Sequence, residues 1–244
     1  MSSQPSLKER VRRGDVIVAL RVPINTTRRE IETALGKGRY DLIYIDGQHS
    51  PFSEDSLVAF CGMAEDLGMP VQLRIPHTRH TYLIGRYLDF GPAAILVPEV
   101  ETEATVDEAV AFAYYPQFGR RSVGGNARFG RKALGEHFNR LNYAAWWNDQ
   151  VVLAIQLESI HAIADVRRLA KPGVDYVAFG PNDLAFSLEA NPEFPLKTVD
   201  DCMRNVAEQL KDSGIPLGMA VTTEPEERDK YLDMGITIFQ ETPR

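Results

Sequence analysis

The chain has 244 residues, of which 44% are hydrophobic, so it can bury a substantial core, either as two small domains or as one large barrel. The formal net charge of −7 argues against nucleic acid as the main partner, because proteins that bind phosphate backbones normally carry a basic face. No apolar window of about 18 residues is present, which excludes a membrane span. The N-terminus lacks the apolar core of a signal peptide. Cys61 and Cys202 lie far apart, and we expect free buried thiols in a reducing cytoplasm.

Short apolar runs rich in β-branched residues alternate with helical patterns along the chain. The predicted strands cover 15–22, 41–46, 70–75, 93–100, 151–158, 174–180, 216–221 and 237–241. The predicted helices, with apolar residues at three- and four-residue spacing, cover 53–67, 78–90, 103–114, 159–170, 198–213 and 224–234. Short segments with glycine or proline, such as LGMP and KPGV, end the helices.

This alternation requires parallel strands connected by crossover helices. A run of eight strands in about 240 residues has the size of a (β/α)8 TIM barrel. A doubly wound open sheet is the competing architecture, but such folds usually carry a glycine-rich phosphate loop after the first strand, and this sequence has none there. We expect one TIM-barrel domain over 1–244, with an insertion at about 116–149 that begins as a loop and ends as a helix.

In a TIM barrel, catalytic groups lie at the carboxyl ends of the strands and on the loops that follow them. The polar residues at or just after these predicted ends are Asp46, His49, Arg74, His77, His80, Glu99, Gln156, Glu158 and Asp183. No lysine is among them, so a carbonyl substrate would be activated by an electrophile rather than through an imine.

Several of these residues have both a catalytic and a structural interpretation. Glu158 and Asp183 follow neighbouring strands and offer hard oxygen ligands for Mg²⁺ or Mn²⁺, or else each only caps the helix that follows it. Arg74 ends an apolar strand, so its charge either pairs with a structural carboxylate or stabilises an oxyanion. His49 is either a loop histidine or a general base near neutral pH.

A set of sequence segments resembles a known enzyme family. The segments are YDLIYIDGQHSP (40–51), LRIP (73–76), YLDFGPAAILVPEVET (87–102), YYPQFGRRSVGG (114–125), IQLES (155–159) and GVDYVAFGPNDLAFSL (173–188). Together they resemble the HpcH/HpaI family of metal-dependent class II pyruvate aldolases, which includes 2-keto-3-deoxy sugar acid and 4-hydroxy-2-oxoheptanedioate aldolases. The resemblance covers roughly residues 15 to 240. It implies reversible cleavage of a 4-hydroxy-2-oxo acid to pyruvate, or a related 2-oxo acid, and an aldehyde.

The resemblance assigns roles to the matching residues. Glu158 and Asp183 resemble the ligands of a divalent metal, with Mg²⁺ or Mn²⁺ expected and Co²⁺ as a further candidate. Arg74 resembles the arginine that stabilises the enolate oxygen. His49 resembles the general acid/base, and Asp46 is expected to orient the turn around it.

The same resemblance implies a set of substrate-binding residues. They are Gln156, Gly180, Pro181, Asn182, Asp183 and Arg121. Backbone amides at Asn182 and Asp183, at a helix start, suit the carboxylate of pyruvate. Arg121 belongs to a loop rich in glycine and arginine that is able to bind an anionic substrate tail.

Asp89 resembles the aspartate that supports the catalytic histidine. It ends a predicted helix at the bottom of the barrel, opposite the carboxyl ends of the strands. It can therefore reach a His49 only if that histidine belongs to another subunit. We therefore expect a homo-oligomer whose active site is completed across an interface. The alternative is that Asp89 is only the last residue of its helix.

The sequence departs from the family pattern in three places. Gln48 stands where many relatives carry glutamate. His77, Arg79 and His80 replace a small polar loop, and they either contact an acidic acceptor or form a solvated helix start. A zinc site at the two histidines is not expected, because no third ligand is evident. The chain also stops soon after its last strand, so we expect the final helix of the family's barrel to be missing.

Two further functions remain open for the same residues. Citrate-lyase-type barrels belong to the same superfamily, so the protein would then be a lyase acting on a CoA thioester, although the shorter chain and the YPQFGRRSVGG loop favour a free acid. A non-catalytic barrel that binds oxo acids is the other alternative, but a mere binder has no need of an acid/base residue. In each case the partner is a small molecule.

Overall fold

In the computed structural model, which describes residues 5–124 and 139–244, eight parallel strands form a closed barrel. The strands are β1 (Ile17–Arg21), β2 (Leu42–Asp46), β3 (Val71–Arg74), β4 (Ala94–Val97), β5 (Val152–Leu157), β6 (Tyr176–Phe179), β7 (Leu217–Thr222) and β8 (Ile236–Glu241). Each strand pairs with the next, and β8 pairs with β1 with Ile17 opposite Ile238. This closure confirms the TIM barrel and excludes the open sheet.

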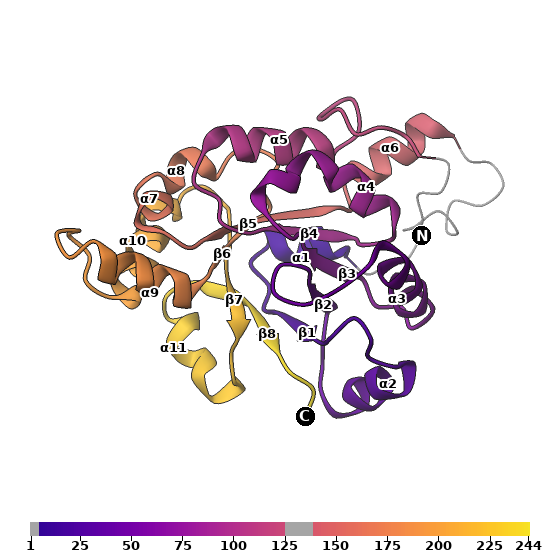
Figure 1. The fold of residues 1–244 in the computed structure, drawn as a ribbon, viewed down its shortest axis with the longest axis horizontal. Coiled ribbons are helices and arrows are strands. Elements are labelled where there is room, and N and C mark those ends of the chain that lie inside the picture. The colour runs from indigo at the N-terminus through magenta and orange to yellow at the C-terminus, as the bar shows by residue number, and fades with distance from the viewer. Residues whose placement is uncertain (1–4, 125–138) are drawn as a thin grey trace.

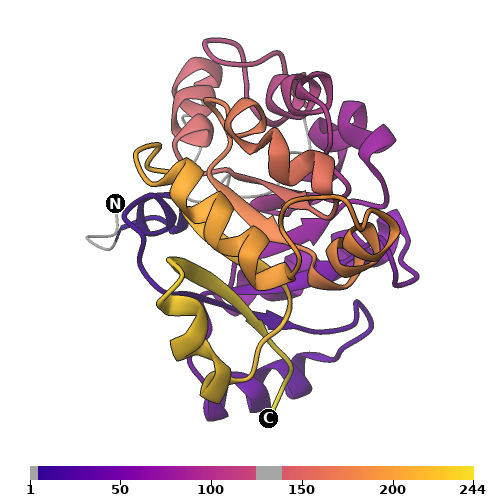
Figure 2. The same cartoon turned by 90° about the vertical axis from the view of Figure 1, so that its left-hand side faces the viewer.

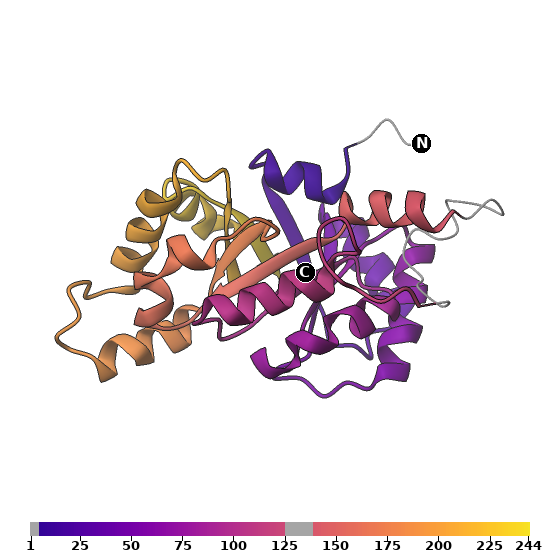
Figure 3. The same cartoon turned by 90° about the horizontal axis from the view of Figure 1, so that it is seen from above.

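Helices surround the strands on the outside of the barrel (Figure 1, Figure 2 and Figure 3). They are α1 (Leu7–Arg12), α2 (Arg28–Lys37), α3 (Glu54–Asp66), α4 (Ile84–Asp89), α5 (Glu103–Ala113), α6 (Arg140–Asn148), α7 (Ile160–Ala164), α8 (Val166–Leu169), α9 (Pro181–Ala190), α10 (Val199–Leu210) and α11 (Arg228–Leu232). The 3-10 helices η1 (Thr78–Leu83) and η3 (Pro225–Glu227) precede α4 and α11. Within the described ranges no helix has the length and apolar character needed to cross a bilayer.

Three predicted helices are divided in the structure. The segment predicted at 78–90 is η1 followed by α4, the one at 159–170 breaks at Asp165 between α7 and α8, and the one at 224–234 is η3 followed by α11. The insertion ends in α6, as predicted, and residues 125–138 of that insertion lie outside the described residues. Residues 242–244 follow β8, and the C-terminus lies between α11 and α2 in the view of Figure 1.

Apolar periodicity does not predict α1, α2 or α9. The first two begin with capping boxes, in which Ser6 pairs with Glu9 and Thr27 pairs with Glu30. A capping box satisfies the free amides of the first helical turn, so it stabilises a helix that has few apolar residues. These local signals identify both helices where the periodicity is too short or too polar.

The core has two layers, one inside the barrel and one between the strands and the surrounding helices. Tyr44 and Tyr176 fill the barrel interior, where the Tyr176 hydroxyl accepts a hydrogen bond of 2.6 Å from the Gln72 amide. Val11 of α1 belongs to the same interior cluster. Helix α1 therefore closes the barrel at the amino ends of the strands and leaves the carboxyl ends, here called the mouth, for the polar residues.

Lys8 ties α1 to this closed end of the barrel. Its Nζ donates to the Tyr114 hydroxyl at 2.9 Å and to the Val151 carbonyl at 2.7 Å, and it lies 3.2 Å from the carboxylate of Asp175. Asp175 also receives hydrogen bonds from Arg12 and from Tyr114. Burial lowers the pKa of the Lys8 amine to about 8, although the charge of Asp175 acts in the opposite direction.

Replacing this lysine tests how much the network stabilises the fold. Lys8→Met leaves Asp175 buried with one cationic partner fewer, and we expect the free energy of unfolding to fall by about 2–3 kcal/mol. Urea denaturation monitored by circular dichroism measures the change. The control is Lys211→Met, which removes an exposed lysine paired with Glu208 and is expected to have no measurable effect. Equal stability of the two variants would contradict the role of Lys8.

Candidate functional site

Asp46 is the last residue of β2 and holds two arginines at the mouth of the barrel. Its Oδ1 accepts from Arg74 Nε at 2.8 Å and its Oδ2 accepts from Arg74 Nη2 at 2.5 Å, a bidentate pair between neighbouring strands. Arg21, the last residue of β1, donates to Oδ2 at 2.8 Å. Burial alone would raise the pKa of the Asp46 carboxyl, but the hydrogen bonds and charge of Arg74 outweigh it and hold the pKa below its usual value.

The turn after β2 is fixed by the same carboxylate. The backbone amides of Gln48 and His49 both donate to Asp46 Oδ1, at 3.0 and 3.3 Å. The His49 side chain is exposed beyond this turn. Asp46 therefore neutralises Arg74 and also binds the backbone of the segment that carries His49.

Gln156 connects the arginine to a buried acid. Its Oε1 lies 3.5 Å from Arg74 Nη1, and its Nε2 donates to Glu158 Oε1 at 2.7 Å. The other oxygen of Glu158 accepts from the backbone amide of Glu99 at 2.7 Å. Burial raises the pKa of Glu158 to about 7, and the neighbouring charge of Asp183 also raises it, against the Glu99 hydrogen bond and the charge of Arg74, which lower it.

Helix α9 begins directly beside Glu158. A side chain at Gly180 would place its Cβ 2.5 Å from Glu158 Oε1 and 2.7 Å from Gln156 Nε2, so only glycine fits there. Pro181 is the first helical residue, and Asp183 is exposed in the first turn. The backbone amides of this turn lie at the mouth, beside the acid.

The helix-capping interpretation of the two carboxylates is wrong. Helix α7, which follows Glu158, is capped by Ser159, whose hydroxyl accepts from the amide of Ala162. Helix α9 has Gly180 at its N-cap position and no side-chain capping bond. Neither Glu158 nor Asp183 makes a capping bond, so helix capping does not compete with metal binding at these carboxylates.

The donor set fits a hard divalent cation. Glu158 and Asp183 provide carboxylate oxygens close enough for their charges to interact, and the hydrogen bonds to Glu158 use only part of its acceptor capacity. In residues 5–124 and 139–244 no group of three or more histidine, cysteine or acidic side chains is placed to hold a metal. Mg²⁺ and ions like it are held by one or two carboxylates, together with water and substrate, which is what this pair offers.

Asp89 and Arg121 are not part of this constellation within one chain. Arg121 Nη2 donates to Asp89 Oδ1 at 2.6 Å, and the guanidinium lies 4.1 Å from the ring centre of Trp147 and 4.8 Å from that of Tyr115. The Arg121 side chain is 0% exposed, whereas that of Asp89 is 28% exposed. The expectation that Arg121 binds a substrate tail is not supported by this placement, because its charge is enclosed by aromatic rings and by Asp89.

The mouth also contains Arg21, which the sequence does not single out, and it shows what Glu99, His77 and His80 contact. Arg21 ends an apolar strand just as Arg74 does, and that shared signal identifies it in retrospect. Glu99 accepts a hydrogen bond from the Gln48 side chain and pairs with His77. His80 turns away to Tyr87, where its Nδ1 lies 3.0 Å from the tyrosine hydroxyl.

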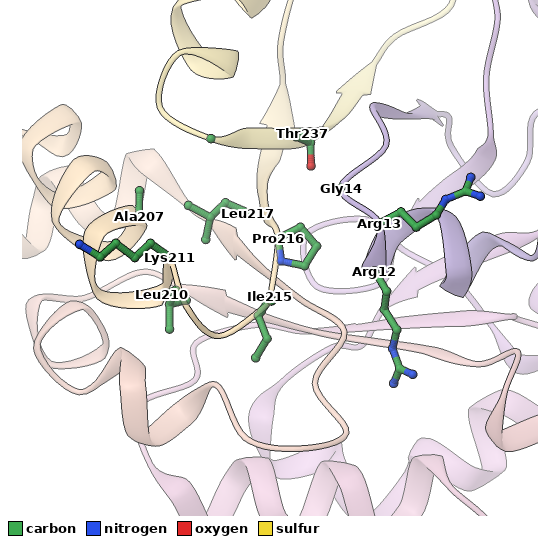
Figure 4. A pocket seen from close by; sticks show the side chains of 12 residues that line it. Arg12, Arg13, Gly14, Ala207, Leu210, Lys211, Ile215, Pro216, Leu217 and Thr237 are labelled. Carbon is green, nitrogen blue, oxygen red and sulfur yellow. The ribbon is translucent and has the colours of Figure 1, made fainter.

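A cavity of about 390 Å³ lies at the opposite end of the barrel (Figure 4). Its lining includes the start of β7 and three basic residues. Each of these is paired with an acid: Arg12 with Asp175, Arg13 with Asp15, and Lys211 with Glu208. None of the predicted site residues lines this cavity. We therefore place the candidate site at the mouth and not here.

The Asp46 pairing predicts a contrast in stability between two aspartates of the mouth. Asp46→Asn leaves Arg74 buried without a counter-charge, so we expect the free energy of unfolding to fall by about 3 kcal/mol. Asp183→Asn removes a charge that repels Glu158, so the stability is expected to stay the same or rise. Thermal and urea unfolding of both variants measure the contrast, and a larger loss for Asp183→Asn would refute the charge assignment.

Comparison with known proteins identifies the family of this chain. The HpcH/HpaI aldolase/citrate lyase family model matches residues 24–241. The chain is 32% identical over 195 residues to a 2-keto-3-deoxy-L-rhamnonate aldolase of Escherichia coli O1:K1 / APEC, a match that covers 74% of this chain and 66% of that relative, less than two thirds of its length. It is 30% identical over 224 residues to a 5-keto-4-deoxy-D-glucarate aldolase of Shigella boydii serotype 18, covering 90% of this chain and 80% of the relative.

Solved structures show the same fold. The crystal structure of an HpcH/HpaI aldolase from Desulfitobacterium hafniense DCB-2 superposes with a TM-score of 0.80 at 24% identity, covering 98% of this chain and 91% of the other. An HpcH/HpaI aldolase/citrate lyase family protein from Burkholderia cenocepacia J2315 gives a TM-score of 0.77 at 25% identity, covering 97% and 91%. With the family model matched across nearly the whole barrel, the chain belongs to the HpcH/HpaI aldolase/citrate lyase family.

Proposed function

We propose that this protein is a metal-dependent aldolase that reversibly cleaves a 4-hydroxy-2-oxo acid to pyruvate, or a related 2-oxo acid, and an aldehyde. The observation that carries the proposal is the arrangement at the mouth. Gln156 lies between the charged Arg74 and Glu158, and the charge of Asp183 acts on Glu158, so an arginine and two carboxylates lie close together. In the described part of the chain no lysine lies at a strand end, so an imine route has no candidate nucleophile.

Glu158 and Asp183 are the residues that would hold Mg²⁺, Mn²⁺ or Co²⁺, and such an ion polarises the 2-oxo group and acidifies the adjacent C–H bond. The first-turn amides of α9 have no intrahelical acceptor, so they are free to donate to the substrate carboxylate. Arg74 is already charged and fixed by Asp46, and it donates to the oxygen that becomes negative without having to reorganise.

His49 is the proposed proton carrier. In the cleavage direction it takes the proton of the C4 hydroxyl, directly or through water, as the C3–C4 bond breaks and the aldehyde leaves. The bonding electron pair passes to the oxygen held by Arg74, and C3 then takes a proton to give the 2-oxo acid. The exposed position of His49 permits this proton to exchange with solvent.

A shared active site between subunits is the second part of the proposal. Asp89 ends α4 and lies beside the start of β4, at the closed end of the barrel, so His49 of the same chain is out of its reach. Arg121 binds one oxygen of Asp89, and the Asp89 side chain remains 28% exposed. We propose that the neighbour is a second copy of this chain, whose His49 meets Asp89.

Pyruvate release tests the aldolase assignment. Purified protein is incubated with a 4-hydroxy-2-oxo acid in the presence of Mg²⁺ or Mn²⁺, and pyruvate is followed with lactate dehydrogenase. We expect cleavage that EDTA abolishes and either metal restores. Arg74→Lys, which keeps the charge but loses the bidentate bond to Asp46, is expected to lower kcat by about 10²-fold or more. Cleavage that persists in EDTA would refute the metal site, and no cleavage of any such acid would favour the non-catalytic binder.

Mixing two inactive variants tests the shared site. Asp89→Ala and His49→Ala proteins are each expected to be inactive as homo-oligomers. Hybrids formed by unfolding and refolding them together regain activity in the sites that combine a native Asp89 with a native His49. The control is the same mixing of Asp46→Asn with His49→Ala, two residues of one mouth, which is expected to restore nothing. Hybrids that form but stay inactive would contradict the shared site.

A further inference from the structure

Glu99 has an unusual backbone conformation for its residue type. Its φ is +51°, in the left-handed region that glycine and asparagine favour, and the residue lies just past the end of β4. Holding a glutamate there is unfavourable, and such strain persists where the surrounding structure imposes it, often at functional sites. The conformation directs the Glu99 amide to Glu158 Oε2 at 2.7 Å, so Glu99 stands directly beside a proposed metal ligand.

The Glu99 side chain is contacted by Gln48 and His77, which belong to two other loops. Gln48 Nε2 donates to Oε1 at 3.0 Å, and His77 Nε2 lies 3.4 Å from Oε2. The Glu99 side chain remains 47% exposed. Among the ion pairs of the described residues, no lysine or arginine joins Glu99, so its negative charge faces the mouth without a permanent cation.

His77 orients this carboxylate and is not itself free to act as a base. Its Nδ1 accepts a hydrogen bond of 3.0 Å from the backbone amide of Arg79. An imidazole that accepts at Nδ1 carries its proton at Nε2, the nitrogen that faces Glu99. Glu99 retains free acceptor capacity, because the Gln48 hydrogen bond and the His77 contact use only part of what a carboxylate offers.

We propose that Glu99, positioned by Gln48 and His77, determines which aldehyde this enzyme accepts. The inference rests on the proposed function, in which the 2-oxo acid half of the substrate lies against Glu158 and the aldehyde half extends into the mouth. There the free acceptor positions of Glu99 bind hydroxyl groups of an uncharged aldehyde. The same carboxylate repels an aldehyde that ends in a carboxylate, because like charges in a partly enclosed site are costly.

A matched pair of aldehydes tests the inference. Glyceraldehyde and 2-hydroxy-3-oxopropanoate differ only in a CH₂OH group that is replaced by a carboxylate. Each is condensed with pyruvate in the presence of Mn²⁺, and the ratio of the two kcat/KM values is measured. We expect the wild-type protein to prefer glyceraldehyde by about tenfold or more, the effect of roughly 1.4 kcal/mol of differential interaction.

Variants at one position separate charge from shape. Glu99→Gln keeps the size of the side chain and removes the charge, and it is expected to reduce the glyceraldehyde preference by about tenfold. Glu99→Asp keeps the charge in a residue that tolerates the left-handed backbone, and it is expected to retain part of the preference. Glu189→Gln, which removes an exposed carboxylate from the far end of α9, is the control and leaves the ratio unchanged.

Deuterium exchange at the methyl group of pyruvate is a reference reaction that requires no aldehyde. The wild-type protein and Glu99→Gln are both expected to catalyse this exchange, which also shows that the variant is folded. Exchange with an unchanged aldehyde ratio in Glu99→Gln overturns the role of Glu99, as does a wild-type preference for the acid. Absence of exchange in the wild-type protein overturns the proposed aldolase function itself.

Discussion

The carboxylate of Asp46 is the interaction on which the rest of the mouth depends. It receives two hydrogen bonds from Arg74, one from Arg21 and two from the turn that carries His49, and so it joins the ends of three adjacent strands to one buried charge. A buried guanidinium needs such a partner, because an unpaired charge in the protein interior is strongly unfavourable. The arginine is therefore present and charged before any substrate arrives.

The same pairing determines what Glu158 can do. Because Asp46 takes the bidentate face of Arg74, the arginine reaches the acid only through the neutral amide of Gln156. Among the described residues Glu158 has hydrogen-bond donors but no directly paired cation, and burial together with the charge of Asp183 raises the pKa of its carboxyl. A direct bond between Arg74 and Glu158 would have satisfied both groups and left no acid for the proposed metal site. Because the Gln156 amide lies between them, Arg74 and Glu158 are close to each other without forming an ion pair.

The sequence predicts these features to different degrees. Strand and helix alternation is enough for the barrel, and the ends of the strands locate Asp46, Arg74, Gln156 and Glu158, since side-chain position follows from strand register. Whether Glu158 and Asp183 cap helices cannot be decided from residue types, because it depends on which backbone amides the carboxylates face. The burial of Arg121 between Trp147 and Tyr115 is likewise a tertiary contact between distant segments that no local pattern contains.

The closure of β8 on β1 bears on how the protein folds. Ile17 and Ile238 become neighbours although almost the whole chain separates them, so this pairing forms against a large loop-closure entropy. Until it forms, β1 and the last completed strand each present an unpaired edge that can pair with another chain. Asp46 and Arg74 lie on β2 and β3, so their pair can assemble while the sheet is still open. The mouth would then begin to form around its central charge during synthesis, whereas protection from edge-to-edge aggregation comes only with the last strand.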